Sequence, residues 1–176
     1  MQIQKTNFDE FEKNIDNEFH KLDNIPSGKG NKWWTKEVKN AVRKVSKERE
    51  REYKIYASGC DQADGREWLY DLTCLEEEGD YLKGIPLVLE SEWKNTKKNY
   101  EEYGIRYDFK KLLVSRADHR VMVLEAESDE KGKDIINQLL QHVQKCRHSM
   151  VGDRYLFACW SKAKGVFDCS VYVVKE

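Results

Sequence analysis

The stretch GIPLVLESEWK, residues 84–94, decides the fold prediction. Its run of branched apolar side chains has the length and composition of a buried strand. The run ends in two carboxylates, Glu90 and Glu92, which alternate with Ser91 and therefore share one face of the strand. Because a buried carboxylate is costly without a partner, this strand end indicates a site where the acidic side chains meet a cation or another partner.

The whole chain predicts a single domain over residues 1–176, although its charged content of 36% is high. The net charge of −1 excludes a polycation, so a nucleic-acid surface would have to come from local segregation of charge. Five cysteines without metal-type spacing indicate a reducing compartment. The sequence has no signal-peptide core and no apolar run as long as a membrane span, so we expect a cytoplasmic protein that does not enter a membrane.

Hydrophobic periodicity predicts an α/β fold. A crossover helix follows three strands and leads into a fourth, which implies a mixed central sheet with helices on both faces. The helices are expected over 8–22, 33–50, 98–117 and 134–146, and the strands over 52–58, 66–76, 85–93, 119–127, 154–160 and 167–174.

A basic stripe marks the helix expected over 33–50. Residues 32–54 hold nine Lys or Arg against four Glu, and the cations lie opposite the apolar side of the helix. Two interpretations are open, an ordinary solvated face or a surface that contacts nucleic-acid phosphates. The candidate phosphate contacts are Lys36, Lys39, Arg43 and Lys47.

A third carboxylate, Asp71, lies in the middle of the strand expected over 66–76. If that strand pairs with the strand that carries Glu90, three carboxylates meet at one edge of the sheet. Like charges so close cannot all stay ionised without a cation, and carboxylate oxygens suit Mg²⁺ or Mn²⁺. The alternative is a surface cluster, or carboxylates that pair with Lys94, Lys110 or Arg106.

An Asp in one strand, an apolar strand that ends in Glu-x-Glu, then a helix and another strand together resemble the PD-(D/E)XK superfamily. This resemblance implies a restriction-endonuclease-like αβββαβ core over about residues 33–127, after an N-terminal helix and before an αββ extension. The segments EWLYDLTCLE, LVLESEW and YDFKKLL are similar to those of small bacterial members with an ESEW motif.

The resemblance also implies roles for individual residues. Asp71 and Glu90 would bind the Mg²⁺ or Mn²⁺ ion, with help from the Ser91 carbonyl. Glu92 occupies the position where the superfamily usually has lysine, and Lys111 is the candidate for a lysine that has moved to the following helix. The implied activity is that of a metal-dependent nuclease, which hydrolyses phosphodiester bonds of DNA or RNA.

Two other functions stay open from the sequence. Glu92 in the lysine position is compatible with a nucleic-acid-binding module of the same fold that has lost catalysis. The near-zero net charge is compatible with a protein-interaction domain, and a homodimer or another protein partner fits either function.

Overall fold

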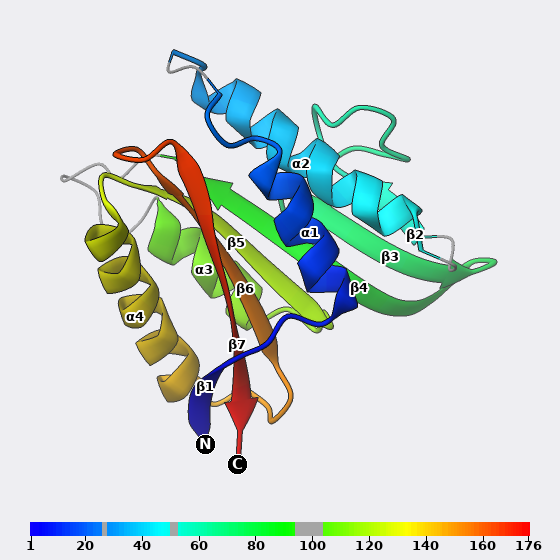
Figure 1. Ribbon diagram of the computed structural model, residues 1–176. Coiled ribbons are helices and arrows are strands. Elements are labelled where there is room, and N and C mark those ends of the chain that lie inside the picture. Colours follow the sequence, from blue (N-terminus) through cyan, green and yellow to red (C-terminus); the bar gives the residue numbers. More distant parts are fainter. Residues whose placement is uncertain (26–27, 50–52, 94–103) are drawn as a thin grey trace.

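A computed structural model describes residues 1–25, 28–49, 53–93 and 104–176. Over these residues the chain forms four helices and one seven-stranded sheet with the strand order β1-β7-β6-β5-β4-β3-β2 (Figure 1). The strands are β1 (Gln2–Thr6), β2 (Tyr53–Tyr56), β3 (Leu72–Glu78), β4 (Tyr81–Glu92), β5 (His119–Ala126), β6 (Arg154–Ser161) and β7 (Val166–Lys175). The helices are α1 (Glu10–His20), α2 (Asn31–Lys47), α3 (Ile105–Leu113) and α4 (Asp129–Lys145).

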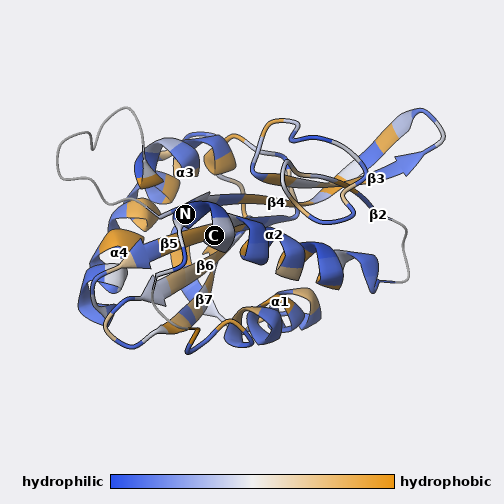
Figure 2. Cartoon of the chain, turned by 90° about the horizontal axis from the view of Figure 1, so that it is seen from above, coloured by the Kyte–Doolittle hydropathy of each residue, from blue (hydrophilic) through white to orange (hydrophobic). Residues whose placement is uncertain are grey.

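Helices cover both faces of the sheet. Helices α1 and α2 pack on one face, where their apolar stripes meet side chains such as Leu87 and Leu89 of β4. Helices α3 and α4 pack on the other face, against side chains such as Val88 and Met122. Seen from above, the strands lie between these two helix layers (Figure 2). The alternation of Leu87, Val88 and Leu89 between two cores explains why β4 is a continuous apolar run.

The sheet is mixed, as predicted. Strand β4 pairs antiparallel with β3 and parallel with β5, and β5 pairs parallel with β6. Strand β7 returns antiparallel to β6. The element order α2-β2-β3-β4-α3-β5 matches the predicted order of helices and strands, and an αββ unit follows it.

Some boundaries differ from the prediction. The strand expected over 66–76 begins only at Leu72, so Asp71 directly precedes β3 instead of lying in its middle. Of the helix expected over 98–117, residues 98–103 lie outside the described part of the chain and the helix ends at Leu113. The sequence pattern does not predict β1, because the five residues QIQKT are mostly polar and form a short edge strand.

The start of α1 is joined to the sheet by an ion pair. Asp9 caps α1 in a reciprocal capping box with Glu12. Glu12 is fully buried, and its two carboxylate oxygens accept hydrogen bonds from Arg154 of β6 at 2.9 and 2.6 Å. This bidentate ion pair offsets the cost of burying the carboxylate and holds the start of α1 at the first residue of β6.

We expect Arg154→Ala to lower the free energy of unfolding by about 3–5 kcal/mol, because it leaves the Glu12 carboxylate buried without a cation. Chemical denaturation measures the change. The double variant Glu12→Gln/Arg154→Met should lose much less, since it removes both charges and keeps an acceptor for the Asp9 amide. Lys83→Ala, which removes an exposed pair with Glu78, is the control and should change stability by less than about 1 kcal/mol. Equal losses in the single and double variants would contradict this account.

Candidate functional site

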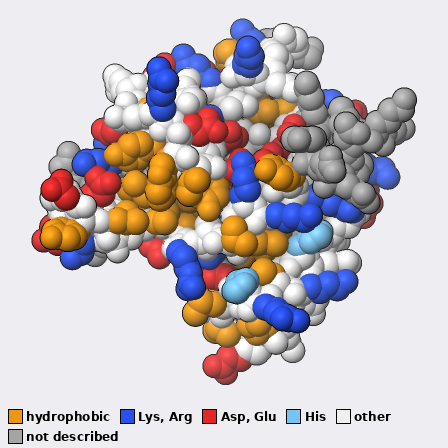
Figure 3. All heavy atoms as spheres, turned by 180° about the vertical axis from the view of Figure 1, so that it is seen from behind, with side chains coloured by type: hydrophobic (Ala, Val, Ile, Leu, Met, Phe, Trp, Pro, Cys, Tyr) orange, Lys and Arg blue, Asp and Glu red, His pale blue; other side chains and the backbone are white. Residues whose placement is uncertain are grey.

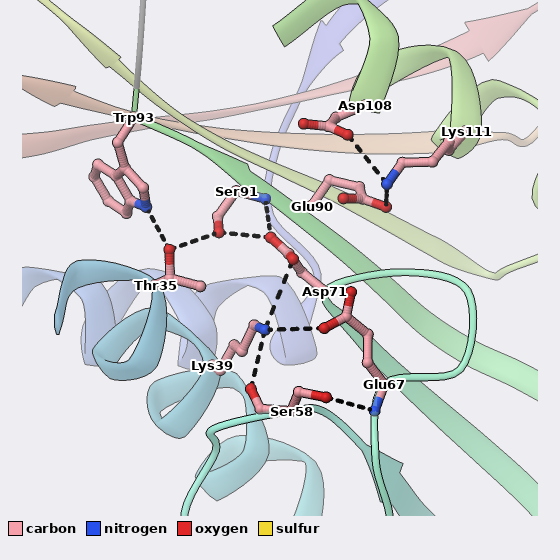
Figure 4. Close-up of polar contacts among 10 residues, drawn as sticks. All are labelled: Thr35, Lys39, Ser58, Glu67, Asp71, Glu90, Ser91, Trp93, Asp108 and Lys111. Carbon is pink, nitrogen blue, oxygen red and sulfur yellow. Dashed lines mark hydrogen bonds and ion pairs between the residues drawn. The ribbon is translucent and has the colours of Figure 1, made fainter. Parts of the chain in front are cut away.

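The candidate site lies where β3 begins and β4 ends. Leu72 pairs with Leu89 across the two strands, so Asp71 and Glu90 are the next residues beyond that pair. The sequence-predicted carboxylates are therefore brought to one end of the sheet. Their side chains turn in different directions: that of Asp71 lies toward α2, and that of Glu90 toward α3 (Figure 4).

Glu90 forms an ion pair with Lys111 of α3. The Glu90 side chain is only 2% exposed, and its Oε1 lies 2.6 Å from Lys111 Nζ. The ammonium also lies 3.1 Å from Oδ1 of Asp108, one helical turn earlier on α3. Lys111 thus bridges two carboxylates. The Glu90 contact is short, but Oε1 accepts no well-angled hydrogen bond among the described residues, so the lysine satisfies it only in part.

The pKa of Glu90 is raised to about 8, mainly by burial and also by the charges of Asp71 and Asp108, while Lys111 acts in the opposite direction. Burial also raises the pKa of Asp108, with a contribution from Asp71. For Lys111, burial alone would lower the pKa, but Glu90 and Asp108 raise it, so the ammonium stays charged. The cluster therefore favours one cation and resists full ionisation of its carboxylates. Such a group can exchange a proton near neutral pH.

Asp71 belongs to a hydrogen-bonded network on the other side of β4. Its Oδ2 accepts hydrogen bonds from the amide and the hydroxyl of Ser91, at 2.8 and 2.7 Å. Thr35 of α2 lies 3.4 Å from the Ser91 hydroxyl and accepts a hydrogen bond from the Trp93 indole. Lys39 Nζ lies 3.7 Å from Asp71 Oδ1. These contacts join α2 to the last residues of β4.

The expectation that three carboxylates meet is not met among the described residues. Asp71, Glu90 and Glu92 form no group of three ligand atoms within 4.8 Å of one another. Glu92 is half-buried two residues after Glu90. The Asp71 and Glu90 carboxylates still act on each other electrostatically, since the charge of Asp71 contributes to the raised pKa of Glu90. Lys94 lies outside the described residues.

The basic stripe of α2 faces other parts of the protein. Lys39 is 3% exposed and donates a hydrogen bond to the Ser58 carbonyl, so neither a solvated position nor the predicted phosphate contact holds for it. Lys36 and Lys47 form 2.9 Å ion pairs with Asp61 and Asp64. Arg43 is half-buried and contributes to the lowered pKa of Asp61. The segment after β2 therefore neutralises the stripe.

The sequence identifies Lys111 but misses Asp108. Lys111 lies nearly opposite the apolar side of α3, yet its long flexible stem lets the ammonium reach Glu90. Asp108 precedes Lys111 by three residues, a spacing that puts both side chains on neighbouring parts of one helix surface. That spacing in DFKKLL is the signal that could have identified Asp108.

A second cluster of ligand-type side chains lies at the opposite ends of β5 and β6. Asp9, Glu12 and His119 bring their ligand atoms within 4.8 Å of one another. His119 Nε2 lies 2.7 Å from Asp9 Oδ2, and Glu12 is bonded to Arg154. Burial would raise the pKa of Asp9, but His119 and the Glu12 amide lower it to about 2. A metal ion would have to displace these partners, so the cluster is a structural network.

Comparisons with protein-family models, with curated proteins and with solved structures find no match to this chain. Among the helices that the structure describes, none is long and apolar enough to cross a membrane.

Replacing Glu90 by Gln should change how stability depends on pH. The pKa of Glu90 is about 8 in the folded protein against 4.5 for the ordinary group, so the folded state holds more protons between these values. The contribution of Glu90 to the free energy of unfolding of the wild type therefore falls as pH rises from 4.5 to 8. The Gln variant lacks this contribution, and its stability relative to wild type should rise across that window, by up to about 1.4 kcal/mol per pKa unit.

Urea denaturation at a series of pH values measures this difference. Glu78→Gln is the matched control, because Glu78 is an exposed glutamate on the same hairpin. It should follow the wild-type profile. If Glu90→Gln loses stability relative to wild type as pH rises, Glu90 is ionised and held by Lys111, and the assigned pKa direction is wrong.

Proposed function

We propose that the chain is a metal-dependent nuclease that hydrolyses phosphodiester bonds, with its active site at the β3–β4 end of the sheet. The observation that carries the proposal is the buried Glu90, which ends an apolar strand beside Asp71 and pairs with a lysine from the next helix. The element order from α2 to β5 is the order that the PD-(D/E)XK resemblance implies, and it supports the same proposal.

The chemistry of the side chains fits a hard divalent cation. Asp71, Glu90 and Asp108 supply carboxylate oxygens, the ligands that Mg²⁺ prefers. The raised pKa values of Glu90 and Asp108 indicate that Lys111 alone gives too little positive charge to keep both ionised. Asp71, Glu90 and Asp108 would hold the ion once their carboxylates draw together, because among the described residues these three form no group of ligand atoms within 4.8 Å of one another. The Ser91 carbonyl stays a predicted ligand, while the Ser91 amide and hydroxyl orient Asp71.

When bound, such a cation polarises a phosphodiester and lowers the pKa of a water molecule. The residues of the chain contribute the rest. The Lys111 ammonium, 34% exposed, can donate hydrogen bonds to a phosphate oxygen and stabilise the charge that develops on it. Because a carboxylate binds the ion in its deprotonated form, an ion at Glu90 would lower the pKa of this carboxyl from about 8, and its affinity would rise with pH. The network of Lys39 and Ser91 holds the Asp71 carboxylate beside them.

The test is cleavage of labelled single-stranded DNA, duplex DNA and RNA with and without Mg²⁺ or Mn²⁺. We expect cleavage only with the metal and none in EDTA. Asp71→Ala, Glu90→Ala and Lys111→Ala should each reduce it by about 100-fold or more. Glu78→Ala is the control for loss of a carboxylate and should keep full activity.

Binding of the ion can be followed without substrate. Mg²⁺ in excess should raise the free energy of unfolding of the wild type, by about 2.7 kcal/mol at a concentration 100 times its dissociation constant. Glu90→Gln should abolish this gain and Glu78→Gln should not. Folded wild type that cleaves no substrate and gains no stability from Mg²⁺ or Mn²⁺ would contradict the proposal.

A nucleic-acid-binding module without catalysis is the second candidate. It is favoured by the contacts of Asp71, whose carboxylate is bonded to Ser91 and Lys39 and does not converge with Glu90 and Glu92. An inactive site needs no cation, and a hydrogen-bonded aspartate is stable there without one.

Glu92→Lys separates the two candidates. Because Glu92 does not join the other carboxylates, we expect this variant to cleave as well as the wild type or better, with a lysine now in the usual superfamily position. Loss of cleavage would show that Glu92 itself holds the ion or a water molecule. If neither wild type nor Glu92→Lys cleaves while both bind nucleic acid, the inactive module replaces the enzyme.

A further inference from the structure

Helices α3 and α4 present two adjoining rows of polar and basic side chains next to the candidate site. On α3, Arg106 and Lys110 are one turn apart and lie on one side of the helix. On α4, Gln138, His142 and Lys145 recur at helical spacing. Arg106 donates a hydrogen bond to the Gln138 side chain at 2.9 Å, so the two rows are in direct contact.

Carboxylates neutralise the lysines of α2, but among the described residues they do not neutralise the lysines of these two rows. Residues 135–148 contain no Asp or Glu. Among the described residues, no carboxylate oxygen lies within 4.0 Å of the Lys110 or Lys145 ammonium, whereas Lys36, Lys39 and Lys47 of α2 all lie within that distance of one. The pKa of His142 is lowered by burial and then by Arg106, Lys110 and Lys145, so three cations act on the same imidazole.

The basic surface and the site share helix α3. Figure 3 shows the face that carries α3 and α4, and blue and pale-blue side chains gather in its lower right part. Lys110 is adjacent in the chain to Lys111, whose ammonium bridges Glu90 and Asp108. A polyanion bound at Lys110 would therefore lie one residue along α3 from the lysine of the cluster.

We propose that the α3–α4 surface, defined by Arg106, Lys110, His142 and Lys145, binds the phosphate backbone of nucleic acid and leads the strand to the Glu90–Asp108–Lys111 cluster. The proposal rests on the function proposed above and names its substrate-binding surface. Cations attract nucleic acid chiefly through its phosphates, with release of counterions. Nucleic acid is favoured over an anionic membrane, because the surface ends at a site suited to phosphodiester chemistry.

The experiment is equilibrium binding of fluorescently labelled single-stranded and duplex 20-mers in EDTA, followed by anisotropy over a range of salt concentrations. The variant Lys110→Gln/Lys145→Gln should weaken binding at low salt. It should also reduce the slope of log K against log salt by about one to two, close to one for each phosphate that the protein no longer neutralises. Lys13→Gln/Lys32→Gln, which removes two exposed lysines from α1 and α2 on the other face, should leave the slope unchanged.

An equal slope in wild type and Lys110→Gln/Lys145→Gln would overturn the inference, and so would an equal change in the control. Binding of wild type to phosphatidylserine vesicles but to neither oligonucleotide would overturn it in favour of a membrane surface. The two proposals fail separately. If the wild type cleaves but the variant has the wild-type salt slope, the nuclease proposal stands and the α3–α4 binding surface is wrong. If the variant has a reduced slope but the wild type cleaves nothing, the binding surface stands and the nuclease proposal is wrong.

Discussion

The burial of the Glu90 carboxylate is the constraint on which the site depends. Residues 86–90 of β4 are buried on both faces of the sheet, so the first acidic side chain after the apolar run is almost fully removed from solvent. Such a group costs several kcal/mol unless it is paired, protonated or bound to a cation. Lys111 offsets part of this cost, and its backbone carbonyl also lies 3.5 Å from the Tyr70 hydroxyl. Helix α3, the segment before β3 and the end of β4 are thereby joined at one point.

The last residues of β4 connect the two helix layers. Glu90 faces α3, while Ser91 contacts Thr35 of α2 and holds Asp71. Alternation along a strand makes this division unavoidable, because neighbouring residues point to opposite faces. Two carboxylates that lie toward opposite faces of the sheet can bind a common ion only at the end of the sheet, where no strand separates the two faces. Asp71, which directly precedes β3, occupies that position.

Periodicity in the sequence predicts most of the fold, because each helix buries one apolar stripe and the central strands are apolar runs. The supposition that the strands of Asp71 and Glu90 are neighbours is confirmed by the pairing of Leu72 with Leu89, but Asp71 precedes β3 and does not lie in the middle of a strand as predicted. The direction of the Asp71 side chain could not be predicted, because it is set by contacts with Ser91 and Lys39 that are distant in the sequence. Trp68 shows the same limit: it falls within the strand expected over 66–76, but β3 begins only at Leu72 and the residue is 49% exposed.

The two basic helices show why charge patterns in a sequence do not by themselves identify a binding surface. Helix α2 has the stronger stripe, yet the segment after β2 returns across it and supplies Asp61, Asp64 and Glu67 as partners. Helices α3 and α4 have fewer cations, but no acidic residue occurs between Ile135 and His148. Paired charges cancel at the distance of an approaching polyanion, whereas like charges that share one surface add. A chain with a net charge of −1 can therefore carry a local positive field, and tertiary contacts decide which helix provides it.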